Sequence, residues 1–165
     1  MSRFITLFIL LLLCTSLIQS ALLQHLSPWG IRPDLFIIFV IFFSFKFNAK
    51  QANLPIFIVG ITKDVFSAGP LGLNAFLFII CGFLISLIKD RIFKEHPFTQ
   101  AIITFIISVL YGTGYVSVLS LSSHSVSITG IGWRITAVAL YTALIAPFAY
   151  LLLCRFRFSY LFERR

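Results

Sequence analysis

The residues best placed to do chemistry are an adjacent cation and anion, Lys63 and Asp64, in a chain that is otherwise largely apolar. Gly60 stands four residues before Asp64, so it lies on the same helix face and leaves room there for a neighbouring backbone. A turn sequence follows at residues 67–72, before a new apolar segment. Free N–H groups at the start of that segment's helix can bind the Asp64 carboxylate. Two readings stay open: Asp64 caps the next helix, or it contacts a partner or ligand.

Neighbouring side chains diverge by about 100° around a helix, so an ion pair between Lys63 and Asp64 is not expected. We predict instead that Lys63 extends to the outer membrane interface. Pro70 is suited to the first turn of the helix that follows, and Gly72 to a tight helix start.

No other group of residues has the spacing of a catalytic or metal site. The three histidines fall in separate loops, at positions 25, 96 and 124. The three cysteines stand singly in apolar segments, without metal-ligand spacing. Neither a Ser/His pair nor paired carboxylates occur at useful spacing. The sequence therefore predicts no enzyme, no cofactor and no metal.

The composition indicates a membrane protein. Apolar residues make up 59% of the 165-residue chain, its mean hydropathy is +1.03, and 20 residues are Phe. Soluble proteins contain about 45–50% apolar residues. The net charge is +8, but basic residues are neither in runs nor interleaved with aromatic ones, so we predict no nucleic-acid partner. The lipid bilayer is the expected surroundings.

Six apolar segments predict an all-α integral membrane protein with six transmembrane helices in one bundle. The whole chain, residues 1–165, is expected to form this single domain. The helices are expected at about residues 4–23, 33–47, 54–66, 71–88, 99–121 and 131–154.

The second and third segments would reach only about 20 Å across roughly 30 Å of hydrocarbon. We expect lysine side chains to extend their reach, with a partly covered hairpin as the alternative. In the second segment, Pro33 is expected at the first helical position, with the Asp34 carboxylate beside the positive end of the helix dipole.

The basic residues predict the topology. With six spans and a cytoplasmic N-terminus, the cytoplasmic side receives ten of the 13 Lys and Arg residues and the outer side receives Arg32, Lys63 and Arg134. This bias follows the positive-inside rule and places both termini in the cytoplasm. Small residues recur every four positions on the fifth and sixth segments, which predicts helix contacts there; they are Thr104, Ser108 and Gly112, and Ala139 and Ala143.

Two motifs resemble those of the rod shape-determining protein MreD family. The first is Arg-Pro-Asp-Leu at residues 32–35, which opens an apolar span. The second joins Gly60 and Asp64 to a Pro-Leu-Gly turn and a following alanine. Lys63 departs from the family, which more often has an uncharged residue there. The positions carried over as structural or partner-contact candidates are Pro33, Asp34, Gly60, Asp64, Pro70, Leu71, Gly72 and Ala75.

The resemblance implies a non-enzymatic inner-membrane scaffold of the bacterial elongation machinery. It would support rod shape and lateral peptidoglycan synthesis by binding MreC, beside the MreB filament and the peptidoglycan synthase pair. It also implies a fold similar to the substrate-binding subunits of energy-coupling-factor transporters. The alternative function is such a small-molecule-binding transporter subunit. Against it, the first segment lacks their Ala-x-x-x-Ala pattern and offers only Ser16 and Ser20.

Overall fold

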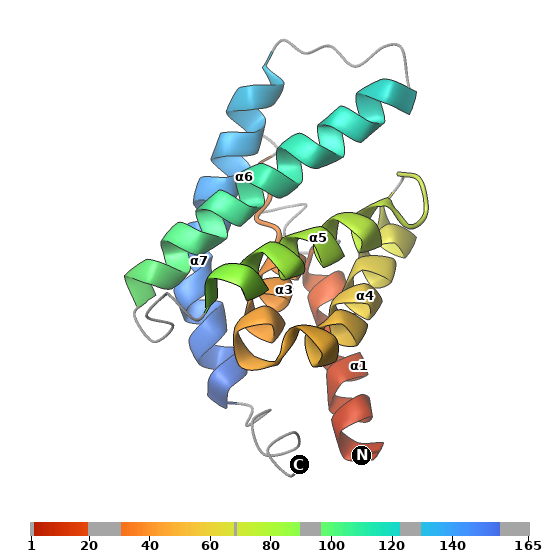
Figure 1. Ribbon diagram of the computed structural model, residues 1–165, viewed down its shortest axis with the longest axis vertical. Helices are drawn as coiled ribbons and strands as arrows, with labels where there is room; N and C mark the ends of the chain where they lie inside the picture. Colours follow the sequence, from red (N-terminus) through yellow and green to blue (C-terminus); the bar gives the residue numbers. More distant parts are fainter. Residues whose placement is uncertain (1, 20–30, 68, 90–96, 123–129, 156–165) are drawn as a thin grey trace.

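The chain is all-α throughout the part that the computed structural model describes, which is residues 2–19, 31–67, 69–89, 97–122 and 130–155. Figure 1 shows the arrangement of the six helices that these described residues form. In chain order they are α1 (Ser2–Leu17), α3 (Leu35–Lys46), α4 (Ala49–Phe66), α5 (Leu73–Ile88), α6 (Pro97–Ser122) and α7 (Ile131–Arg155).

The short helix α3 lies at the centre of the molecule. Ten consecutive side chains, residues 36–45, are buried, and α4, α5, α6 and α7 all contact this helix. A helix that is covered on every side has no polar face, which explains its unbroken apolar sequence. Aromatic rings fill much of the space around it; the Phe42 ring, for example, meets the Tyr150 ring of α7 edge-on at 5.4 Å between centroids.

Helices α4 and α5 pack closely because Gly60 has no side chain. A Cβ atom at Gly60 would lie 2.3 Å from the Cα atom of Ala75, a distance at which one backbone would have to move. A Cβ atom at Gly82 of α5 would likewise lie 2.7 Å from the Ile56 side chain of α4. The prediction that Gly60 admits a neighbouring backbone is confirmed.

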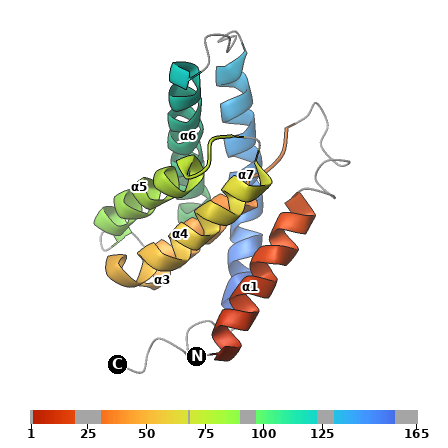
Figure 2. The same ribbon diagram turned by 90° about the vertical axis from the view of Figure 1, so that its right-hand side faces the viewer.

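Helices α6 and α7 form a long pair beside the group made of α3, α4 and α5 (Figures 1 and 2). A Cβ atom at Gly112 would lie 2.9 Å from the Ile135 side chain; Thr104, Ser108, Ala139 and Ala143 are buried. The small residues predicted to mark helix contacts therefore do so. Among the described residues, two helical segments are long and apolar enough to cross a membrane, Phe98–Leu121 and Ile131–Leu153, while Leu35–Lys46 and Leu73–Ile88 are apolar but shorter.

Several predicted boundaries were wrong. Helix α4 begins at Ala49 rather than residue 54, and its 18 residues reach about 27 Å, so it is not a short helix. Pro55 lies inside α4. Proline favours a helix break, but this helix continues past it. Helix α5 begins at Leu73 rather than residue 71. The α-helical part of α1 runs to Leu17 and π-helical turns follow to residue 19, so the predicted end of this helix near residue 23 stays a prediction. Residues 20–23 lie outside the described part of the chain.

The first and last described helices, α1 and α7, begin and end, respectively, at the same end of the molecule. The start of α1 and the end of α7 are both at the lower end in Figure 1, and the turned view agrees (Figure 2). The turn from α4 to α5 lies away from that end.

Candidate functional site

Asp64 lies in the last turn of α4 and binds the start of α5. Its Oδ2 atom accepts hydrogen bonds from the backbone N–H groups of Gly72 (3.0 Å) and Ala75 (3.2 Å). Its Oδ1 atom accepts from the backbone N–H (3.1 Å) and the side-chain amide (2.9 Å) of Asn74. The first N–H groups of a helix have no partner within the helix and carry its positive dipole end. The prediction that Asp64 caps this helix is confirmed, and the side chain is only 1% exposed.

The turn before α5 reaches the carboxylate through its backbone. Gly72 occupies the N-cap position with φ 93°, a left-handed conformation that glycine adopts without steric cost. Because α5 begins at Leu73, Pro70 lies in the preceding turn, where its carbonyl accepts from the Leu73 N–H (3.3 Å); the prediction that Pro70 belongs to the first helical turn was wrong. The Leu71 side chain is 80% exposed and takes no part in this capping.

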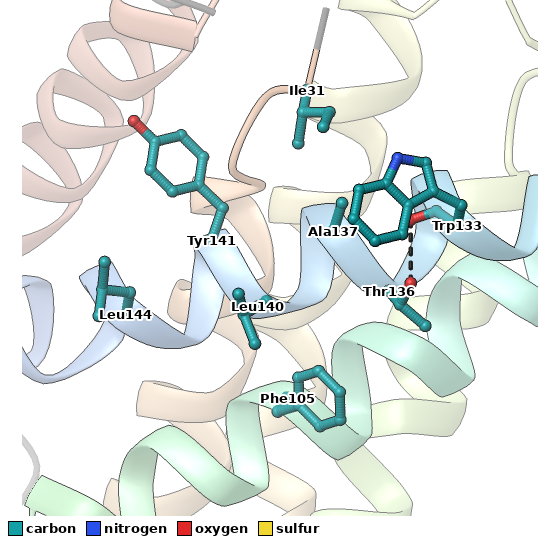
Figure 3. Close-up of a pocket in the computed structure, with 8 residues that line it drawn as sticks. All are labelled: Ile31, Phe105, Trp133, Thr136, Ala137, Leu140, Tyr141 and Leu144. Carbon is teal, nitrogen blue, oxygen red and sulfur yellow. Dashed lines mark hydrogen bonds between the residues drawn. The ribbon is translucent and has the colours of Figure 1, made fainter. Parts of the chain in front are cut away.

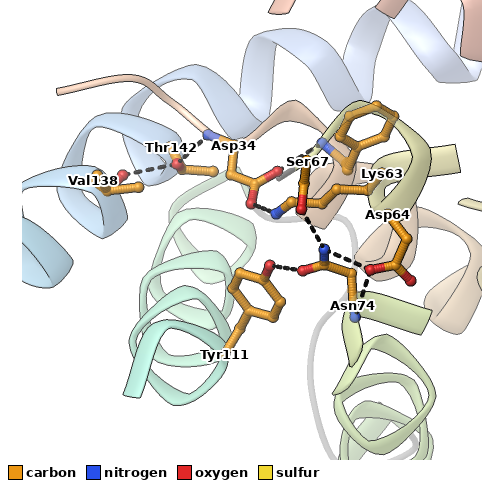
Figure 4. A network of polar contacts seen from close by, with 9 residues as sticks. Asp34, Lys63, Asp64, Ser67, Asn74, Tyr111, Val138 and Thr142 are labelled. Carbon is orange, nitrogen blue, oxygen red and sulfur yellow. Dashed lines mark hydrogen bonds and ion pairs between the residues drawn. The ribbon is translucent and has the colours of Figure 1, made fainter. Parts of the chain in front are cut away.

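Asn74 connects Asp64 to α6. Its side-chain amide donates to Asp64 and, more weakly, to the Ser67 hydroxyl (3.4 Å). Its Oδ1 atom accepts a hydrogen bond from the Tyr111 hydroxyl of α6, as Figure 4 shows. Asn74 is 1% exposed, so both ends of the buried amide are satisfied by protein groups.

Lys63 forms a largely enclosed ion pair with Asp34 at the start of α3 (Figure 4). The two side chains are only 14% and 9% exposed, respectively. The Lys63 ammonium also lies 4.2 Å from the centroid of the Tyr111 ring and 5.1 Å from that of Phe78, positions that favour cation–π attraction.

The prediction that Lys63 extends to the outer interface was therefore wrong. A lysine that reached outward would leave Asp34 unpaired in the bundle, and an uncompensated buried charge is strongly destabilising. The argument that Lys63 and Asp64 diverge around the helix was correct, since the two side chains have different partners.

Asp34 joins α3 to α7 as well as to α4. It is the N-cap residue of α3, and its side chain accepts a hydrogen bond from the Phe36 N–H (3.2 Å). Pro33 consequently precedes the cap, a correction to its predicted place at the first helical position. The Asp34 backbone N–H donates to the Thr142 hydroxyl of α7 (2.9 Å), which in turn donates to the Val138 carbonyl (2.7 Å).

These contacts form one buried polar cluster that connects α3, α4, α5, α6 and α7. Of the predicted candidates, Asp34, Asp64, Gly72 and Ala75 belong to it, and Gly60 lies against Ala75. Pro33, Pro70 and Leu71 only flank it. The cluster's polar groups bind one another, so the arrangement is suited to fixing helix positions.

The members of the cluster that sequence reasoning missed include Asn74, Tyr111 and Thr142. The sequence did contain a signal for Asn74: it is a polar amide near the start of an apolar segment that is otherwise almost free of polar residues. The structure shows that this amide is buried. Within the described residues, no three His, Cys, Asp or Glu side chains gather as a metal site would require.

A second feature is an apolar groove along α7, with a volume of about 430 Å³. Figure 3 shows Phe105 of α6 and Ile31 beside a row of α7 side chains that includes Trp133, Leu140 and Leu144. The Thr136 hydroxyl in this groove is satisfied by the Trp133 carbonyl (2.9 Å). The groove therefore offers hydrocarbon contact, which suits lipid chains or an apolar helix.

A family model described as rod shape-determining protein MreD matches residues 1–156, a span that contains the whole polar cluster. No curated protein matches the chain, and no solved structure matches it either.

Proposed function

The chain belongs to the rod shape-determining protein MreD family, and from this premise we propose that it is a non-enzymatic scaffold of the cell-elongation machinery. The family places the protein in a bacterial membrane with a role in determining rod shape. In the finer proposal, it binds the membrane helix of an MreC-like protein and so supports lateral peptidoglycan synthesis. Association with the MreB filament and the peptidoglycan synthase pair would then be indirect or secondary.

The observation that carries this proposal is the buried polar cluster. It joins five helices through contacts such as Lys63–Asp34, Asn74–Asp64 and the Asp34 N–H to Thr142. Interiors linked by satisfied polar networks are rigid. A scaffold requires a rigid frame that presents a constant outer surface to its partners, and the apolar outer faces of α6 and α7 provide such a surface.

We place the contact with the MreC-like helix at the groove between Phe105 and the outer face of α7. Leu140 and Leu144 stand four residues apart on that face and are 67% and 74% exposed. A partner helix would gain dispersion contacts there, which drive helix association in lipid.

The test is co-purification of the MreC-like protein with a double variant, Leu140→Ala with Leu144→Ala. The matched control is Phe83→Ala with Leu87→Ala on α5, also four residues apart and 56% and 60% exposed. We expect only the α7 pair to reduce the partner recovered at equal membrane abundance. Equal recovery from both variants would contradict this surface, and no recovery with the unmodified chain would contradict the scaffold function itself.

We further propose that the chain forms one domain with six crossings and both termini in the cytoplasm. The ten-to-three distribution of basic residues and the shared end of α1 and α7 (Figure 1) support this topology. With Cys14, Cys81 and Cys154 replaced by alanine, a membrane-impermeant maleimide should label Ser123→Cys from outside and leave Ser2→Cys unlabelled. Labelling of both positions would rule out this orientation.

The transporter-subunit alternative is not favoured, since the family match points to shape determination. The expected fold similarity to energy-coupling-factor subunits stays a prediction. Co-purification with a transporter ATPase, and not with cell-shape proteins, would reverse this preference.

A further inference from the structure

A pocket separate from the α7 groove lies where α6, α7 and the start of α3 meet. Its volume is about 350 Å³, within the range of about 300–1,000 Å³ that is usual for small-ligand sites. Apolar residues such as Ile37, Ile135 and Val138 make up most of its lining. The pocket and the α7 groove have no lining residue in common, so a molecule in the pocket would not compete with a helix in the groove.

The pocket runs from one face of the membrane to the middle of the bundle. Arg134 lines it and is the fourth residue of the apolar span Ile131–Leu153. The 23 residues of this span reach about 35 Å, against roughly 30 Å of hydrocarbon, so its first turn lies at the bilayer interface. Tryptophan is enriched at that level, and the adjacent Trp133 is 71% exposed.

The other end of the pocket lies at Asp34. The Asp34 N–H donates to the Thr142 hydroxyl (Figure 4), and Thr142 stands eight positions after Arg134 on α7. Eight helical residues correspond to about 12 Å, which is close to the depth of one leaflet of hydrocarbon. The pocket therefore has the depth of a single lipid leaflet.

Arg134, at the shallow end, has no acidic partner among the described residues. Its side chain is exposed, and the ion pair recorded in this part of the chain joins Lys63 to Asp34. Asp34 is the acidic residue that lines the pocket, but it lies at the deep end and Lys63 neutralises it. A guanidinium presents a fork of donors that fits phosphate, so the shallow end suits a phosphate.

Ser108 of α6 presents a second group without a partner. Its side chain lines the pocket and is only 3% exposed. Thr104 and Ser117 of the same helix donate to carbonyls one turn earlier, whereas the Ser108 hydroxyl makes no hydrogen bond within the described part of the chain. Its oxygen is not fully enclosed by protein, so a molecule in the pocket can reach it.

The two groups lie at different depths. A Cβ atom at Gly112 would be 2.9 Å from the Ile135 side chain, so Gly112 lies level with Ile135, which follows Arg134. The end of α6 and the start of α7 are at the same end of the molecule (Figure 1), and Ser108 is therefore one turn deeper than Gly112, or about 6 Å. In a glycerophospholipid the acyl ester carbonyls likewise lie a few ångströms below the phosphate, and the acyl chains lie below them.

We propose that this pocket binds one anionic phospholipid from the leaflet that surrounds the start of α7. Arg134 binds the phosphate, the Ser108 hydroxyl donates to an acyl ester carbonyl, and the chain lies against Ile37 and Val138. A partner helix has its backbone groups bonded internally and would give Ser108 no backbone acceptor. The inference rests on the membrane location of the family and is independent of any partner protein.

The experiment is a titration of the purified full-length chain in detergent with dioctanoyl phosphatidylglycerol, followed by native mass spectrometry. Arg134→Gln should weaken binding about tenfold or more, because it removes charge-assisted hydrogen bonds. The control, Arg32→Gln, removes an exposed charge that does not line this pocket and should leave binding unchanged. Equal weakening by both variants would mean that the lipid responds only to net charge and would overturn the proposal.

A comparison of two lipids tests Ser108. Ser108→Ala should weaken binding of the diacyl lipid about fivefold, because one neutral hydrogen bond is lost. It should not change binding of the dioctyl ether analogue, which has no ester carbonyl. Ser117→Ala is the control, since this exposed hydroxyl bonds its own helix and does not line the pocket. An equal effect of Ser108→Ala on both lipids would contradict the ester contact.

Two further measurements complete the test. Arg134→Lys keeps the charge and loses the planar donor fork, so it should weaken binding by less than Arg134→Gln does; equal weakening would contradict the phosphate contact. Glycerol 3-phosphate should bind far more weakly than the lipid, because it lacks the acyl chains. If it bound as tightly, the ligand would be a soluble phosphate and the lipid assignment would be wrong. Absence of measurable lipid binding by the unmodified chain would also overturn the site.

Discussion

The group formed by α3, α4 and α5 and the pair formed by α6 and α7 use different means of cohesion. The first group holds its helices with charged contacts, namely the Lys63–Asp34 ion pair and the four hydrogen bonds to the Asp64 carboxylate. The hydrogen bonds that join the α6–α7 pair to that group come from neutral hydroxyls, Tyr111 on Asn74 and Thr142 on the Asp34 N–H. The Lys63 ammonium over the Tyr111 ring adds a cation–π contact.

The difference follows from exposure to lipid. Charged side chains are tolerated within a membrane only where protein encloses them, and α3 is enclosed over ten consecutive residues. Helices α6 and α7 turn large apolar side chains outward, among them Leu144 and Phe148, and use small residues where they meet. The charged contacts between helices therefore lie in the interior, while the outer faces of α6 and α7 are apolar and can contact lipid or partner helices.

The largest effect should come from Asp64→Ala. The change leaves the Gly72 and Ala75 N–H groups and the Asn74 amide without their acceptor, which should cost about 3–5 kcal/mol. Thermal unfolding in detergent and membrane abundance measure the loss, and rod shape should fail in a complementation assay. Asp64→Asn keeps one acceptor oxygen and should be intermediate. Normal abundance together with normal rod shape in Asp64→Ala would show that the carboxylate is not what holds α4 to α5.

The next effect should come from Lys63→Met, which leaves the Asp34 carboxylate buried without its cation. We expect about 3 kcal/mol of destabilisation. The double variant Lys63→Met with Asp34→Asn should recover much of this loss, because neither charge is then buried alone. A double-mutant cycle on unfolding temperatures gives the coupling; strictly additive single effects would mean that the ion pair contributes nothing to the central group.

A smaller effect is expected from Gly60→Ala, which tests close packing rather than charge. The added methyl group would meet the Ala75 backbone at 2.3 Å, and overpacking of this kind costs about 1–3 kcal/mol. The control is Gly132→Ala in α7, where a Cβ atom meets nothing within 4 Å. It should be neutral or slightly stabilising, since alanine favours helices. Equal unfolding temperatures for the two variants would contradict the close contact of α4 and α5.

The smallest effects should come from the neutral attachments of the outer pair. Tyr111→Phe and Thr142→Val each remove one hydroxyl contact and should each cost about 1 kcal/mol. Unfolding temperature is again the readout, with Thr113→Val as control, because the exposed Thr113 hydroxyl bonds only the backbone of its own helix. If either hydroxyl proved as costly to remove as Asp64, the contrast between the two regions would be wrong.

The sequence could predict the local part of the site. Asp64 and the N–H groups of Gly72 and Ala75 are separated by 8 and 11 positions, and a turn between two helices brings them together in any arrangement of the bundle. The same holds for Gly60, whose spacing from Asp64 is fixed by the helix itself. The all-α fold class likewise followed from composition and from six apolar segments.

The long-range part could not be predicted. Lys63 and Asp34 are 29 positions apart, Tyr111 and Asn74 are 37, and Thr142 and Asp34 are 108; these pairings depend on which helix faces meet. An unbroken apolar run is equally typical of a helix in lipid and of a helix enclosed by other helices. The sequence therefore could not predict that α3 lies at the centre of the bundle. Lys63 was misplaced for this reason, because its partner lies on that enclosed helix.

The ion pair has a consequence for biosynthesis. Asp34 leaves the ribosome 29 residues before Lys63 does, so α3 is complete while its carboxylate still lacks a counter-charge. An isolated acid is costly in hydrocarbon, whereas the Lys63 ammonium neutralises this carboxylate once α4 has followed. We therefore expect α3 to enter the bilayer together with α4 rather than before it.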